Sequence, residues 1–85
     1  GLTRSLDKLI KSWNHRTGGE TRFTLQIDDG MDILPEPLPV NLYRIVQESL
    51  TNIAKHARAS EASIQLKYVD PHQLILEVED NGKNF

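Results

Sequence analysis

Apolar residues recur along this chain with two different periods, and each change of period predicts a new element. Near the N-terminus the spacing is three or four residues, which is typical of one face of a helix over residues 2–16: Leu2, Leu6, Leu9 and Trp13. Thr17-Gly18-Gly19 ends this pattern. Two interpretations of the helix stay open. It covers the sheet of its own domain, or it is the tail of a longer helix that pairs with other helices upstream, and both can hold at different ends of the same helix.

From residue 21 to 29 apolar and polar residues alternate, which predicts a strand with one buried face. The alternate prolines Pro35, Pro37 and Pro39 then exclude a regular helix before residue 39. From 39 to 58 the helical spacing returns, and one sector of the predicted helix contains Leu42, Ile45, Val46, Ser49, Leu50, Ile53 and Ala57.

The C-terminal part predicts a hairpin, because two alternating stretches near 61–69 and 73–80 are separated by a short turn sequence. We expect both helices to lie on one face of the sheet. The hairpin also assigns a face to Asp80, which shares the parity of Leu74, Leu76 and Val78 and so belongs to the covered face. A carboxylate there costs free energy unless it has a specific partner.

Composition narrows the function classes. The chain has 85 residues, which is one domain at most, and its net charge of −2 gives no reason to expect a nucleic-acid partner. It contains no cysteine, hence no disulfide and no thiolate nucleophile. No apolar stretch approaches the roughly 20 residues of a membrane span. We expect the chain to be a piece of a larger protein.

The second helix also carries a column of polar residues that suggests chemistry. Glu48, Asn52 and Lys55 stand at i, i+4 and i+7, and His56 is expected just inside the apolar border. Oxygen ligands beside an ammonium suit a Mg²⁺ ion and a phosphate. An alternative stays open, in which an asparagine bonds a nearby loop between solvated charges. The three histidines have no zinc-like spacing.

Two segments resemble motifs of a known family. The run from Tyr43 to Ala57 closely resembles the N box of bacterial two-component sensor histidine kinases, in the branch that contains the nitrate/nitrite and hexose-phosphate-uptake sensors. Val78-Glu-Asp-Asn-Gly82 resembles the start of their G1 box. Residues 1–18 are similar to the end of the dimerisation helix and its linker. Residues 19–85 are similar to the N-terminal part of the ATP-binding domain.

The resemblance implies a fold, a ligand and residue roles. The fold would be an incomplete GHKL (Bergerat-type) α/β two-layer sandwich, with helices on one face of a mixed sheet, that binds ATP and Mg²⁺. Asn52 would be a ligand of the Mg²⁺, and Glu48 would be catalytic through the water shell of the metal. Lys55 and His56 would face the phosphates. Asp80 would accept a hydrogen bond from the adenine amino group, and Gly82 would let the backbone approach the ligand.

The resemblance also implies an activity and partners. The parent protein would phosphorylate a histidine outside this chain and pass the phosphoryl group to a response regulator. It would form a homodimer through upstream helices and place this domain in the cytoplasm, with a sensor region anchored in the inner membrane. Two alternatives are an anti-sigma-factor serine kinase and a non-catalytic protein-interaction module of the same fold.

The sequence departs from the family pattern near its end. Asn84 stands where the G1 box has a second glycine, and neither the later glycine-rich box nor the lid follows. We therefore expect the 85 residues alone to bind Mg-ATP weakly or not at all.

Overall fold

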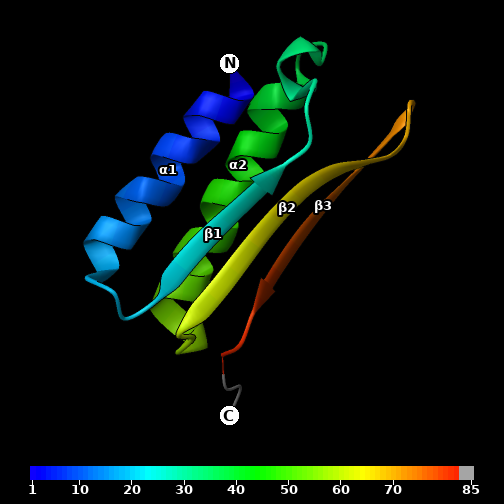
Figure 1. The fold of residues 1–85 in the computed structure, drawn as a ribbon. Helices are drawn as coiled ribbons and strands as arrows, with labels where there is room; N and C mark the ends of the chain where they lie inside the picture. The colour runs from blue at the N-terminus through cyan, green and yellow to red at the C-terminus, as the bar shows by residue number, and fades with distance from the viewer. Residues whose placement is uncertain (83–85) are drawn as a thin grey trace.

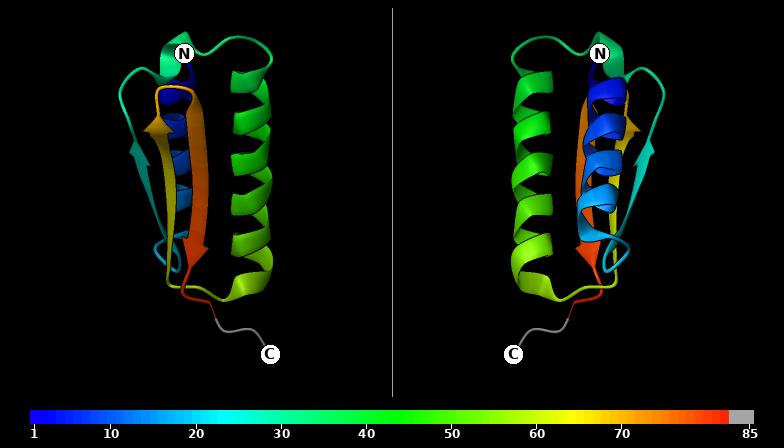
Figure 2. Two further views of the ribbon diagram at one scale, coloured as in Figure 1. Left: turned by 90° about the vertical axis from the view of Figure 1, so that its right-hand side faces the viewer. Right: turned by 90° about the vertical axis from the view of Figure 1, so that its left-hand side faces the viewer.

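In a computed structural model, which describes residues 1–82, two α-helices cover one face of a three-stranded sheet (Figures 1 and 2). The elements in chain order are α1 (Leu2–Thr17), β1 (Arg22–Ile27), a 3₁₀ turn η1 (Met31–Ile33), α2 (Leu38–Asn52), a π-helical turn η2 (Ile53–Ala57), β2 (Glu61–Asp70) and β3 (Gln73–Asp80). All five predicted elements are present, and the long predicted helix is α2 continued by η2. The predicted α+β sandwich is confirmed.

The sheet is mixed. Its order is β1-β2-β3, with β1 parallel to β2 and β2 antiparallel to β3. Ile64 and Leu66 of β2 are fully buried and lie opposite Val78 and Leu76 of β3, which are half-buried. The polar residues between them lie on the uncovered face. The predicted hairpin and its register are therefore confirmed.

The core lies between the helices and the sheet. α1 buries Leu2, Leu6 and Ile10, whereas α2 buries Leu42, Val46 and Leu50. Both sets join one cluster with the sheet residues Phe23, Ile64 and Leu66. α1 therefore covers the sheet of its own domain, as the first of the two interpretations predicted. The domain boundary at residue 18 stays a prediction.

The N-terminus of α1 is capped by an acidic residue that lies far along the sequence. The backbone N–H of Thr3 donates to Asp32 Oδ1 at 3.0 Å, so a side chain from η1 caps the first turn of α1. Met31 next to it is buried. A carboxylate at a helix N-terminus is also favourable because it meets the positive end of the helix dipole. Over residues 1–82, no helix is both long and apolar enough to cross a membrane.

The prediction for Ile45 is wrong. It was expected in the apolar sector of the second helix, but its side chain is 50% exposed. Gln47 lies on the opposite flank of α2 and lines the groove against α1. Ile45 does not line that groove, so its flank faces away from α1, and no other α-helix among the described residues packs against it.

Candidate functional site

The polar column predicted on the second helix is exposed along its whole length. Glu48 and Asn52 lie on the last two turns of α2, and Lys55 lies in η2. Asn52 follows Ile45 by seven residues, or about two helical turns, so both lie on the flank that faces away from α1. Glu48 instead borders a hollow of about 430 Å³ between α1 and α2, together with Trp13. The column thus extends from the side of α2 that faces α1 to the side that faces away from it.

The end of the helix departs from regular α-helical geometry. η2 is a single π-helical turn that contains Lys55 and His56, and such turns are frequent at functional sites. Arg58 ends it in the left-handed conformation, with φ 49°. His56 was predicted just inside the apolar border, but it is exposed, so that prediction is wrong. The side chains of Lys55 and His56 are therefore both available to an anion.

Asp80 has the predicted parity but not the predicted burial. It lies opposite Ala62, a buried residue of the covered face, so the parity prediction is confirmed. Its carboxylate is nevertheless exposed, because Asp80 is the last residue of β3 and ends its covered face. Oδ1 accepts a hydrogen bond from the Gly82 N–H at 2.8 Å. The backbone thus supplies one of the hydrogen-bond donors that the prediction expected from a ligand.

Gly82 brings the two motif segments together. A Cβ at this position would overlap the carbonyl oxygen of Ala57 and lie 2.8 Å from its carbonyl carbon. Only glycine allows this approach. The chain after β3 is therefore packed against the end of η2, which carries Lys55 and His56. The predicted approach of Gly82 to a ligand stays a prediction, whereas its approach to Ala57 was not foreseen.

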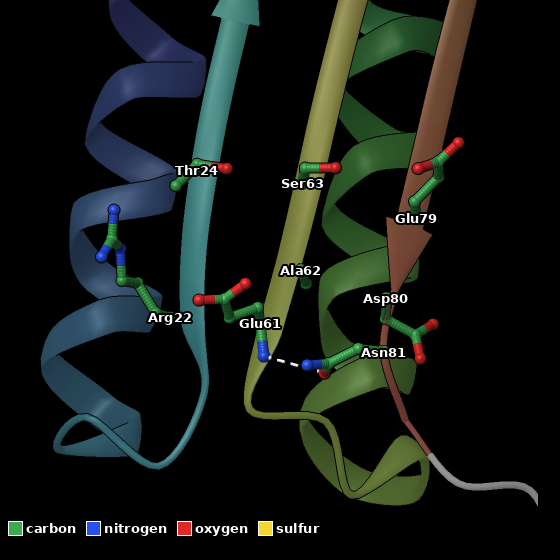
Figure 3. A pocket seen from close by; sticks show the side chains of 8 residues that line it. All are labelled: Arg22, Thr24, Glu61, Ala62, Ser63, Glu79, Asp80 and Asn81. Atoms are coloured by element: carbon green, nitrogen blue, oxygen red, sulfur yellow. Dashed lines mark hydrogen bonds between the residues drawn. The ribbon is translucent and has the colours of Figure 1, made fainter.

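Asn81 is a residue of this region that the sequence analysis missed. Its Oδ1 accepts hydrogen bonds from the N–H groups of Ser60 and Glu61, both at 3.0 Å, and its Nδ2 donates to Ser60 Oγ at 2.9 Å. Its own N–H donates to the carbonyl oxygen of Glu61 at 3.1 Å. Figure 3 shows the side chain pointing to the start of β2. Asparagine after a strand does indicate a turn, but it does not identify the distant partner.

The pocket in Figure 3 includes Asp80 and Asn81 in its lining, but none of the residues of the polar column. It has a volume of about 280 Å³ and opens mainly on the uncovered face, where Arg22, Glu61 and Glu79 line it. None of Asn52, Lys55 and His56 reaches it. We therefore place the candidate site on the helix-covered side, at the ends of η2 and β3.

The donor set fits a hard cation held by few protein ligands. Within residues 1–82, no group of three or more His, Cys, Asp and Glu side chains could hold a metal ion. Asn52 and Glu48 do offer exposed oxygen donors on adjacent turns of one helix. Mg²⁺ commonly binds through one or two protein oxygens together with waters and substrate phosphates, so these residues fit it.

Comparison with known proteins identifies the family. Residues 38–85 match the model described as histidine kinase-, DNA gyrase B-, and HSP90-like ATPase, and this range is more than half of the chain. The chain belongs to this ATPase family. The predicted family is confirmed, while the nitrate and hexose-phosphate sensor branch stays a prediction. Asn84, where the family pattern has a glycine, lies outside the described residues.

Several curated relatives match the chain over its whole length. It is 34% identical to the signal transduction histidine-protein kinase/phosphatase DegS of Brevibacillus brevis and covers 21% of that protein. It is 34% identical to the sensor histidine kinase MctS of Rhizobium johnstonii, covering 18%. It is 32% identical to the sensor histidine kinase ComP of Bacillus subtilis, covering 11%. The chain thus spans about a fifth or less of the length of these relatives.

Proposed function

We propose that this chain is part of the ATP-binding domain of a sensor histidine kinase, whose parent protein transfers the γ-phosphoryl group of ATP to a histidine outside these 85 residues. The observation that carries the proposal is the packing of Gly82 against Ala57, which joins the N-box-like helix to the G1-like turn. The relatives support a histidine kinase in preference to an anti-sigma-factor serine kinase. They are histidine kinases, and they match α1 as well as the ATPase segment.

The polar column would serve the phosphate end of ATP. Asn52 would hold Mg²⁺ through its amide oxygen, and Glu48 would orient a water of the metal shell. Bound Mg²⁺ would neutralise phosphate charge, which is the main catalytic requirement in phosphoryl transfer. Lys55 and His56 are exposed in η2 and would add donors to the phosphates.

Asp80 would serve the adenine end. Its Oδ1 is occupied by the Gly82 N–H, and its Oδ2 has no hydrogen-bond partner among residues 1–82. The free oxygen would accept a hydrogen bond from the adenine 6-amino group. Gly82 would keep the backbone beside the base without a side chain in the way.

The parent protein would have further partners. It would pass the phosphoryl group to an aspartate of a response regulator and form a homodimer through helices upstream of α1. A membrane-anchored sensor region outside this chain would leave the ATP-binding domain in the cytoplasm. The names of the relatives, which include sensor histidine kinases and a histidine-protein kinase/phosphatase, support the transfer to a response regulator.

The experiment is labelling of the full-length natural protein with ATP that carries a radioactive γ-phosphate, with and without EDTA. We expect Mg²⁺-dependent label that is lost in acid and kept in alkali, because phosphohistidine has that stability. Label that survives acid would overturn histidine phosphorylation in favour of the serine kinase. A full-length protein that fails to bind ATP in a calorimeter would instead indicate the non-catalytic module.

A further inference from the structure

The turn that follows β3 is anchored at two separate places. Asn81 bonds to Ser60 and Glu61 at the start of β2, and Gly82 packs against Ala57 at the end of η2. Asp80 immediately precedes these two anchors. Its carboxylate can therefore move only as far as the anchored turn permits.

Both polar atoms of the Asn81 side chain bond to protein groups. Its Oδ1 accepts two backbone N–H groups, and its Nδ2 donates to Ser60 Oγ. These bonds direct the side chain toward the start of β2, so its main contacts are with protein. They join the first residues of β2 to the residue after β3, at a strand end where pairing would otherwise fray.

This turn orients the carboxylate of Asp80. Oδ1 is held at 2.8 Å by the Gly82 N–H, and Gly82 is confined by the Ala57 carbonyl group. Holding one oxygen leaves the other, Oδ2, in a defined direction. An acceptor that is already well directed binds its donor more tightly than a freely rotating one, because less conformational entropy is lost when the ligand binds.

We infer that Asn81 is a positioning residue, which orients Asp80 toward the adenine amino group by clamping the turn between β3 and β2. The inference rests on the proposed ATP site. It adds a residue that acts through Asp80 rather than on the nucleotide itself.

The test is a double-mutant cycle in the full-length protein, with the Kd for Mg-ATP measured by calorimetry. Asn81→Ala should raise the Kd about tenfold, the effect of one hydrogen bond that is no longer well aligned. In the Asp80→Asn background the same change should leave the Kd unaltered. Asn81→Asp should keep near-wild-type affinity, because one carboxylate oxygen still accepts the N–H groups of Ser60 and Glu61 and the other can accept the hydroxyl proton of Ser60.

The outcomes separate the possible causes. An equal loss of affinity in both backgrounds, or no loss in either, would overturn the positioning role. If Asn81→Ala fails to fold, Ser60→Ala replaces it: removing only the acceptor of Asn81 Nδ2 should raise the Kd in the wild-type background alone. A wild-type protein that binds no ATP would refute the proposed function itself, which is a result distinct from failure of the cycle.

Discussion

At the residue scale, the exposure of Asn52 decides what its replacement will do. Asn52→Ala removes an exposed amide and opens no cavity, so the thermal midpoint should not change. In the full-length protein it should abolish Mg²⁺-dependent ATP binding and autophosphorylation, a loss of at least about 100-fold, because removing a ligand should cost more than disturbing a residue that supports one. Calorimetry and γ-phosphate labelling measure both effects.

The matched control for Asn52 is Gln47→Ala, an exposed residue of the same helix that faces the groove against α1. It should retain ATP binding and labelling. If Asn52→Ala bound Mg-ATP as tightly as this control, the metal role of Asn52 would have to be withdrawn.

Asp80→Asn separates nucleotide binding from stability at the proposed adenine end of the site. The amide oxygen can still accept the Gly82 N–H, but a donor can now face the adenine amino group. ATP binding by the full-length protein should weaken by about 1–3 kcal/mol, the range for a mismatched polar group. Because the carboxylate is exposed, the melting temperature should stay within the error of the wild-type value. Calorimetry and thermal denaturation test the two parts, and unchanged affinity would remove Asp80 from the site.

At the scale of elements, one side chain ties α1 to the edge of the sheet. Asn14 Oδ1 accepts the Phe23 N–H at 2.7 Å, and Nδ2 donates to the Phe23 carbonyl oxygen at 3.0 Å. β1 is an edge strand among residues 1–82, so these backbone groups have no strand partner on that side. Asn14 pairs with them as a neighbouring strand would.

Asn14→Ala should therefore lower the free energy of unfolding by about 1–3 kcal/mol, because two partly buried backbone groups of Phe23 lose their partners. Urea denaturation of the 85-residue chain measures this directly. Ser12→Ala, at an exposed position of the same helix, is the control and should change the free energy by less than about 0.5 kcal/mol. Equal stability of the two variants would contradict the bridging role.

At the scale of the whole molecule, two isoleucines of the second helix test where its buried face lies. Ile53 is 7% exposed and belongs to the core cluster, whereas Ile45 is 50% exposed. Ile53→Ala should lower the free energy of unfolding by about 2–5 kcal/mol through a cavity. Ile45→Ala should lower it by about 0.5 kcal/mol or less.

Urea denaturation of both isoleucine variants provides the comparison, with each variant serving as the control for the other. Similar losses would mean that the flank carrying Ile45 is covered in solution. A small loss for Ile53→Ala alone would instead contradict its place in the core.

The sequence by itself determined the elements, their faces and the family motifs. Helical and strand periods are local geometry, so spacing alone placed Leu50 and Leu66 in the core and gave Asp80 its parity. The N-box and G1-like runs are also contiguous, so they could be recognised without coordinates. The spacing of apolar residues shows which face of an element a side chain lies on, but not how deeply that side chain is buried.

The tertiary structure decided what meets at each position. Ile45 is exposed because α1 packs on the other flank of α2, and Asp80 is exposed because it ends its strand. The partners of Asn14, Asn81 and Gly82 are residues far along the chain, brought together by helix packing and strand pairing. Such contacts have no period in the sequence, because they depend on how separate elements pack and not on the geometry within one of them.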